Sequence, residues 1–393
     1  MKVRPGSHLA NLLYLLSVSG EFPSKSLNIL GDERTMKAMV HKMESAHDFR
    51  LNSDDTILRT KLFQLSGKSG DRTIRLYKGA LGILNELHPN ALEYYMKAFP
   101  YNRFSGNQSC ITRNHRVGEA MVVCMMAGIN VFPYMLPKLQ KESIQHIVLK
   151  EPCFYISRHI KSIMESEYNK TKFTRVAGLM FCPGVSYAVY NARNDVMNWS
   201  GDGEIRAMMD LSAIVRMNAA NFLSKTGHIH EVSSVLLMGT DANAAMKTLI
   251  GSDTSRKQHT RMDKIYPYVH FVPLNRDGAD LVRILTLPDW NERLLRVLFK
   301  PEQINRGYSS VEFDARYDGR YAFSHLDSDI ARLIRFRDVL KIHNSERGSE
   351  GREQMQFDVV CFTWQAEFLR KYLGGLVRLR PVDMGRVLKV LRI

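Results

Sequence analysis

The chain has 393 residues, more than one ordinary domain holds, which predicts two or three domains. Its formal net charge of +15 favours polyanionic partners, nucleic acid first and membrane surfaces second. Since no run approaches the roughly eighteen apolar residues of a membrane span, a membrane-spanning protein is excluded and we expect no membrane partner.

The five cysteines are odd in number and widely scattered, without any Cys-x-x-Cys spacing. They are Cys110, Cys124, Cys153, Cys182 and Cys361. This pattern is typical of reduced thiols in a cytosolic protein and indicates neither a structural zinc nor a disulfide framework. The first residues include two basic side chains but no uninterrupted apolar core, which argues against a secretory signal. We therefore expect a cytoplasmic location.

Three helices are predicted at the start of the chain. Ser7 can cap the first, whose leucines share one face and which ends at Gly20. Ser24 can cap a short second helix. The third is predicted over residues 33–44, with three methionines and Val40 directed to the core.

A strand pair is predicted after these helices. Residues 56–66 and 73–77 alternate between polar and apolar side chains, and the glycine-rich segment 67–70 between them supplies a hairpin turn. Three helices, a strand, a basic turn and a second strand follow one another in the order of a winged-helix DNA-binding domain. We therefore predict double-stranded DNA as the partner of this unit.

Side chains of the third helix and of the hairpin are the candidate DNA contacts. Helix side chains that face away from the core can reach base edges or phosphates in a major groove, and a wing can reach phosphates or the minor groove. A merely solvated helix face is the alternative. The candidates are Arg34, Thr35, Lys37, His41, Lys42, Lys68, Arg72 and Arg75.

Helical patterns continue to about residue 132, where prolines mark the first boundary, so the predicted winged-helix domain with its helical extension spans 1–132. Arg113 and Arg116 lie in a polar, basic segment and are further DNA-binding candidates. The apolar helix that follows, from Val117 to Ala127, either packs back onto the first unit or binds another copy of the chain. A homodimer therefore stays open.

The rest of the chain alternates strands and helices. This favours a mixed α/β domain over 145–344, followed by a linker-like stretch and a final strand and helix with a basic tail over 356–393. The tail either follows a DNA backbone or forms an amphipathic helix end on the last strand.

Two segments carry a resemblance to a known family. Tyr77-Lys78-Gly79-Ala80-Leu81-Gly82-Ile83-Leu84 and Arg113-Asn114-His115-Arg116, together with the winged-helix order, resemble the replication-relaxation family of plasmids and integrative elements. The resemblance implies an initiator or mobilisation protein that acts on origin DNA beside other mobilisation or replication proteins. Some related relaxases carry a restriction-endonuclease-like C-terminal domain with carboxylates and a lysine around a divalent metal, which makes that fold a candidate for 145–344.

The residues for such a metal-dependent nuclease are incomplete in this sequence. The chemistry needs an Asp, then an acid and a lysine two residues apart on the next strand. The nearest residues are Asp195, Asp202 and Glu204-Ile205-Arg206, in which arginine replaces lysine. Asp202 and Glu204 also suit the first turn of a helix. We therefore assign no catalytic residue, no metal ligand and no cofactor.

Two further motifs give weaker signals. His228 and His230 could share one face of a strand and ligate a metal, but no third ligand is evident. Gly239-Thr240-Asp241-Ala242-Asn243 is similar to a nucleotide-binding turn but lacks the phosphate-loop glycine and lysine. A plain turn capped by Asp241 or Asn243 is the simpler interpretation.

The sequence therefore predicts a site-specific DNA-binding protein of a plasmid or mobile element, acting in replication or conjugative mobilisation at an origin. One alternative is a metal-dependent nickase or relaxase whose active centre lies in the C-terminal α/β domain. Another is a transcriptional regulator in which that domain senses a ligand. The missing catalytic set favours a protein that is not an enzyme.

Overall fold

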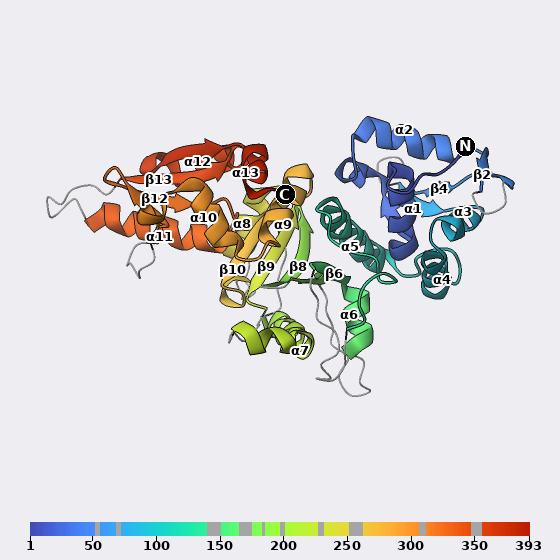
Figure 1. Ribbon diagram of the computed structural model, residues 1–393, viewed down its shortest axis with the longest axis horizontal. Helices are drawn as coiled ribbons and strands as arrows, with labels where there is room; N and C mark the ends of the chain where they lie inside the picture. The colour runs from blue at the N-terminus through green and yellow to red at the C-terminus, as the bar shows by residue number, and fades with distance from the viewer. Residues whose placement is uncertain are drawn as a thin grey trace.

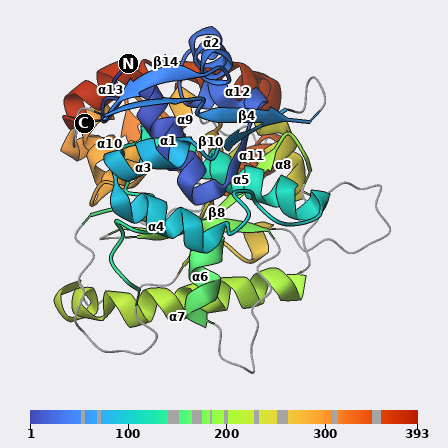
Figure 2. The ribbon, with the colours of Figure 1, turned by 90° about the vertical axis from the view of Figure 1, so that its right-hand side faces the viewer.

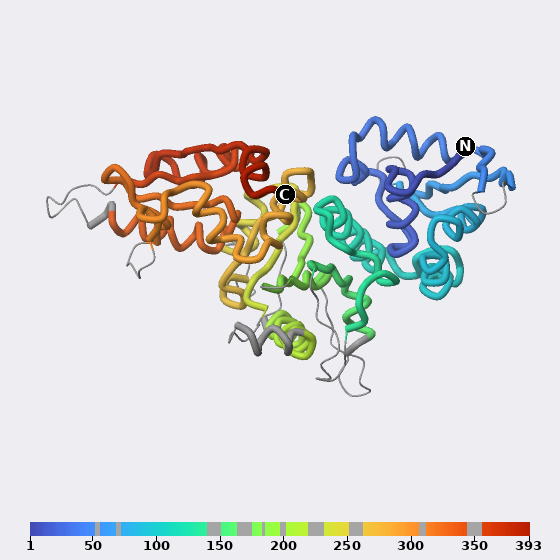
Figure 3. The backbone as a smooth tube through the Cα atoms, in the orientation of Figure 1, coloured from blue at the N-terminus to red at the C-terminus, as the bar shows by residue number. Residues whose placement is uncertain are grey.

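The computed structural model confirms a mixed α/β protein built around several sheets (Figures 1 and 3). Within the described part of the chain, no helix combines the length and the apolar character that a membrane span needs. The described residues are 1–51, 56–67, 72–139, 151–164, 175–182, 185–196, 201–226, 232–250, 262–305, 312–346 and 356–393.

The three predicted N-terminal helices are present. The first, α1 (His8–Ser19), is capped by the Ser7 hydroxyl and ends at Gly20, whose φ of 73° suits glycine. After β1 (Glu21–Pro23), the second helix is a 3-10 helix, η1 (Ser24–Ile29). The third, α2 (Glu33–Met43), is capped by Asp32 and buries Met36, Val40 and Met43.

The strands that follow differ in part from the sequence prediction. A single strand over 56–66 is wrong, because the segment divides into β3 (Ile57–Thr60), which pairs with β2 (His47–Arg50), and β4 (Phe63–Ser66). The break falls at buried Leu62, whose amide donates to Met43 on α2 and whose carbonyl accepts from Tyr77. The returning strand, β5 (Thr73–Leu76), is confirmed, and the sheet order is β1-β5-β4, all antiparallel.

The next three helices close the N-terminal unit and join it to the rest of the protein. They are α3 (Ala80–Leu87), α4 (Pro89–Ala98) and α5 (Gln108–Met126). Helix α5 contacts α1 and β1 on one side and β6, β7, β8 and α9 on the other. Of the two arrangements predicted for its apolar half, packing back onto the first unit is the one found.

A five-stranded sheet forms the centre of the molecule. Its order is β10-β9-β8-β7-β6, with β6, β7 and β8 antiparallel and β8, β9 and β10 parallel. Helices α5 and α9 cover one face, and α7 and α8 cover the other, so that α7 lies far from α2 in both views (Figures 1 and 2). The elements are β6 (Cys153–Ile156), α6 (Ser157–Met164), β7 (Val176–Phe181), β8 (Ser186–Arg193), α7 (Gly201–Thr226), β9 (Ser234–Gly239), α8 (Ala242–Ile250), η2 (Met262–Lys264), β10 (Tyr268–Pro273) and α9 (Arg276–Leu285).

A four-stranded sheet completes the chain, in the order β11-β12-β13-β14 with the last three strands parallel. The predicted C-terminal part, 356–393, supplies β13 and β14, and β13 pairs with β12 of the preceding part. The elements are α10 (Trp290–Leu298), η3 (Pro301–Gln303), β11 (Ala315–Tyr317), β12 (Arg320–Ser324), α11 (Ile330–Glu346), β13 (Phe357–Phe362), η4 (Thr363–Gln365), α12 (Ala366–Leu373), η5 (Gly374–Leu376), β14 (Arg378–Val382) and α13 (Met384–Leu391).

The first turn of α9 tolerates only glycine at position 278. A Cβ added there would lie 1.8 Å from the backbone oxygen of Pro273, which cannot move without shifting β10. We expect Gly278→Ala to lower the free energy of unfolding by about 2 kcal/mol in chemical denaturation. Gly375→Ala is the matched control, because a Cβ there meets nothing within 4 Å. Equal midpoints for the two variants would contradict the expectation.

Candidate nucleic-acid interface

Helix α2 presents the five predicted DNA contacts on its exposed side. Arg34, Lys37 and His41 share one face, since they are three and four residues apart. Lys37 forms an ion pair with Glu33, and His41 contacts Glu44 at 3.2 Å. The Thr35 hydroxyl donates to Asp32 as part of the helix cap, at 2.7 Å.

Two of the five, Arg34 and Lys42, are exposed and make no salt bridge to an acid in the described chain. They are the α2 cations whose charge is least compensated within the protein. This makes them the strongest phosphate-contact candidates on the helix.

The predicted hairpin contacts fall into three situations. Lys68 lies outside the described residues, and Arg72 is exposed at the start of β5. Arg75 lies on the strand itself, and its guanidinium forms an ion pair with the fully buried Glu21 at 2.8 Å. His115 of α5 approaches the same carboxylate at 3.3 Å. Arg75 therefore has a structural partner within the protein, unlike the exposed cations Arg34 and Lys42 of α2.

The two predicted arginines of α5 lie on a cleft of about 400 Å³. Arg113 is exposed there, whereas Arg116 forms an ion pair with Asp195 and donates to the backbone oxygen of Asn191. Arg175, just before β7, adds a third guanidinium to the lining. Burial lowers the pKa of Arg116 from its ordinary value; Asp195 opposes this shift, while neighbouring Arg193 and Arg175 add to it.

The acid and the lysine two residues apart, which a metal-dependent nuclease needs on one strand, occur on neither β7 nor β8. Strand β7, Val-Ala-Gly-Leu-Met-Phe, contains no acid. On the neighbouring β8, Asn191 and Arg193 stand two residues apart, an amide and a guanidinium in place of an acid and a lysine. Glu204 lies in the first turn of α7, where the Tyr190 hydroxyl donates to it at 2.9 Å, as the helix-start interpretation predicted.

The carboxylate of Glu119 on α5 contacts both Asn191 and Arg193, and both of its oxygens accept hydrogen bonds. Its Oε1 accepts from the Ser26 hydroxyl at 2.6 Å and from Arg193 Nη2 at 2.8 Å. Its Oε2 accepts from Arg193 Nε at 2.8 Å and from the Asn191 amide at 2.9 Å. Because both oxygens are engaged and the second acid is absent, these residues do not fit a divalent metal. Within the described residues, no group of three or more His, Cys, Asp or Glu could hold a metal.

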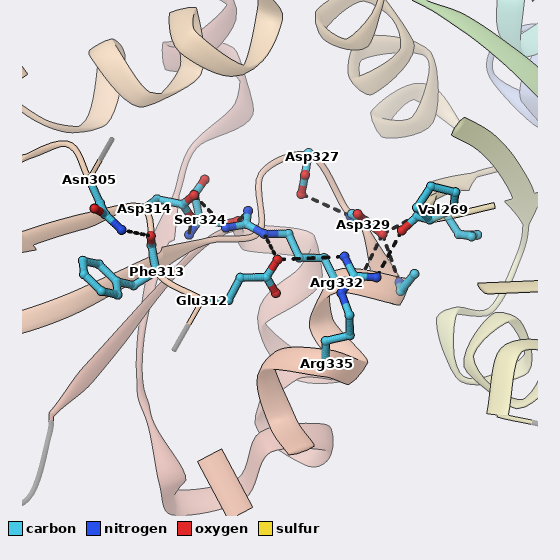
Figure 4. A network of polar contacts seen from close by, with 12 residues as sticks. Val269, Asn305, Glu312, Phe313, Asp314, Ser324, Asp327, Asp329, Arg332 and Arg335 are labelled. Atoms are coloured by element: carbon cyan, nitrogen blue, oxygen red, sulfur yellow. Dashed lines mark hydrogen bonds and ion pairs between the residues drawn. The ribbon is translucent and has the colours of Figure 1, made fainter. Parts of the chain in front are cut away.

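A second group of carboxylates lies between the two larger sheets and is also internally paired (Figure 4). Arg332 donates to Asp314 at 2.7 Å and lies 3.5 Å from Glu312. Asp329, at the start of α11, accepts from the backbone amide of Val269 on β10 at 3.0 Å. This network, which borders a cleft of about 430 Å³, joins the five-stranded sheet to the four-stranded one.

The remaining predicted motifs have simple outcomes. The Asp241 side chain accepts from the amide of Asn243 at 2.9 Å, so the turn after β9 is a capped strand-to-helix turn as predicted. It borders a cleft of about 370 Å³ that His325 and Trp364 also line. His228 and His230 lie outside the described residues.

The basic tail is partly neutralised by one buried acid. Asp358 on β13 accepts from Arg320 at 2.8 Å and from Arg378 at 3.0 Å, while Arg380 lies 3.7 Å away. A helix end at these positions is wrong, because Arg378 and Arg380 lie on strand β14, which pairs in parallel with β13. Contact of the tail with a DNA backbone stays a prediction.

The cleft beside α5 contains residues that sequence reasoning missed, namely Arg175 and, around the adjoining hollow, Arg158 and Lys161. Nothing in their local sequence distinguishes them from ordinary surface cations. The pair Asn191 and Arg193 lies on β8 two residues apart, a spacing that is visible in the sequence.

No protein-family model matches the chain, and searches among curated proteins and among solved structures found no match.

Proposed function

We propose that the protein binds a specific DNA site through α2 and the hairpin between β4 and β5, without cleaving it. The observation that carries the proposal is the exposed basic face of α2, with Arg34 and Lys42 uncompensated by described acids, next to a three-stranded antiparallel sheet. The chain order is α1, β1, η1, α2, the β2-β3 pair, β4 and β5, and the sheet order is β1-β5-β4. Apart from the inserted β2-β3 pair, this is the order expected of a winged helix, in which α2 would be the recognition helix.

The central sheet supports the negative part of the proposal. The chain order here is α5, β6, α6, β7, β8, α7 and β9, with β6, β7 and β8 antiparallel and β9 parallel to β8. Apart from the inserted α6, this is the arrangement expected of a restriction-endonuclease-like core. With Asn191 and Arg193 at the key strand positions, such a core would bind DNA without metal-dependent cleavage.

We further propose a setting in replication or conjugative mobilisation of a plasmid or mobile element. This rests on the resemblance of residues 77–84 and 113–116 to the replication-relaxation family. A regulator of transcription uses the same α2 contacts, so the recovered target sequence separates the two: an origin repeat in one case, a promoter in the other.

The test begins with selection of bound duplexes from a random pool. Arg34→Ala combined with Lys42→Ala should weaken binding of the selected duplex at least about tenfold and reduce the salt dependence by about one counterion for each phosphate contact removed. Lys97→Ala on α4, an exposed lysine on another helix of the same unit, is the matched control.

Unchanged affinity of the double variant, with or without Lys68→Ala, would contradict the role of α2 and the hairpin. Cleavage of supercoiled plasmid by the purified protein with Mg²⁺ or Mn²⁺ would instead support the nickase alternative.

A further inference from the structure

Two hollows lie side by side along α5 and share Arg113 and Val117. The first is the 400 Å³ cleft, which the polar side chains of Gln108, Ser109 and Thr112 line together with the arginines. The second is a smaller hollow of about 190 Å³ whose walls include Phe104, Ile156 and the stem of Lys161. A polar, cationic cleft therefore continues into a largely apolar one.

The cations around these hollows exceed the acids that face them. Arg113, Arg158, Lys161 and Arg175 make no salt bridge to a described acid, and Asp195 pairs with Arg116. The Nε of Arg116 is buried and has no hydrogen-bond partner among the described residues. Arg158 lies over the ring of Phe104 at 5.4 Å and over that of Phe99 at 5.0 Å. The arrangement leaves several guanidinium donors for an anion.

Crowding of like charges points the same way. The pKa of Lys161 lies below its ordinary value, first because of burial and second because of Arg113. A bound anion would relieve this repulsion, and a planar phosphate oxygen pair suits the guanidinium fork better than it suits a lysine.

We propose that this surface binds a single DNA strand, with a backbone phosphate on Arg113, Arg116 and Arg175 and an unstacked base in the hollow beside Phe104. That the strand is DNA rests on the proposed function; the phosphate and base chemistry rests on the two hollows alone.

A single strand fits these hollows better than a duplex does. Small-ligand pockets measure about 300 to 1,000 Å³, so a cleft of this class receives a nucleotide rather than a double helix. A strand out of its duplex also exposes a base face, which aromatic side chains bind without sequence preference. A paired duplex keeps that face stacked inside.

The experiment measures binding of a labelled oligothymidylate by fluorescence anisotropy, in parallel with binding of the selected duplex. Arg113→Ala combined with Arg175→Gln should weaken binding of the single strand at least about tenfold, and Phe104→Ser by roughly tenfold. Arg206→Gln, an exposed arginine on α7 at the opposite face of the sheet, is the control and should bind as the unchanged protein does. Affinity in EDTA should be at least as high as in Mg²⁺, because Mg²⁺ competes with the arginines for the phosphates.

The outcomes separate this inference from the proposed function. The variant Arg34→Ala with Lys42→Ala should lose duplex binding and keep single-strand binding. The variants Arg113→Ala with Arg175→Gln and Phe104→Ser should lose single-strand binding and keep duplex binding. Single-strand affinity unaltered by Arg113→Ala and Arg175→Gln, or binding that needs Mg²⁺, would overturn the inference while leaving duplex recognition intact. Loss of the duplex in neither variant would contradict the proposed function alone. Thermal unfolding of each variant confirms that it is folded.

Discussion

Glu119→Ala is expected to lower the free energy of unfolding by about 3–5 kcal/mol, the cost of removing one partner of a buried ion pair. The Glu119 side chain is 2% exposed and accepts four hydrogen bonds from Ser26, Asn191 and Arg193. Without the carboxylate, Arg193 keeps its charge in a site where its side chain is only 15% exposed. The four donor groups of these three residues then lose their acceptor together.

Urea denaturation followed by circular dichroism measures this effect. Glu93→Ala on α4 is the control, because that glutamate is exposed and surface changes of this kind stay within about 0.5 kcal/mol. Glu119→Gln, which keeps the shape but not the charge, should fall between the two. If Glu119→Ala lowers the free energy of unfolding by less than about 1 kcal/mol, the four hydrogen bonds do not stabilise the packing of α5 on β8 as expected.

Acidification below pH 6.5 is expected to destabilise the protein through His325. Burial lowers the pKa of this histidine to about 4; Asp327 opposes the shift, and Arg332 and His270 reinforce it. The folded pKa is thus below the unfolded value near 6.5, so the unfolded state binds more protons in this window. The stability that neutral His325 confers is complete above pH 6.5 and is lost as the pH falls toward 4, by roughly 3 kcal/mol.

The test compares the unchanged protein with His325→Phe in urea at several values between pH 7.5 and 4. The ring of His325 is stacked near Phe323, and its Nδ1 has no hydrogen-bond partner in the described part of the chain, so phenylalanine suits the site. The difference in unfolding free energy between the two proteins should shift in favour of the variant as the pH falls. Parallel pH curves would rule out the histidine as the cause.

The elements predicted most closely from sequence are those whose signal is local. Helix α2, predicted over 33–44, is observed at Glu33–Met43, and the predicted cap Ser7 and end Gly20 of α1 are both observed, because a capped amphipathic pattern is complete within a few residues. The break at Leu62 was not predictable in this way. It depends on hydrogen bonds to Met43 and Tyr77, which only the folded chain brings together.

The same distinction governs the candidate site. The exposed cations of α2 follow from helical periodicity, whereas the role of Arg75 depends on Glu21, a residue 54 positions away. Arg113 and Arg116 were predicted as equivalent contacts. In the structure both line the cleft, but Arg113 is exposed whereas Arg116 is paired with Asp195, 79 positions away. The cleft forms where α5 meets Arg175 and the start of β7. The helical periodicity of the sequence does not reveal which distant residues a helix will contact.

Helix α5 belongs at once to the N-terminal core and to the central sheet, with Asn114 bonded to Ser19 on one side and Glu119 to Arg193 on the other. A flexible tether would let two DNA-contacting surfaces adjust to each other, but a shared helix fixes their separation. For a protein that acts as proposed, the distance between the duplex-binding surface and the single-strand-binding surface is therefore constant. The point at which a strand leaves the double helix would lie at a constant number of base pairs from the recognised sequence, whatever the intervening bases are.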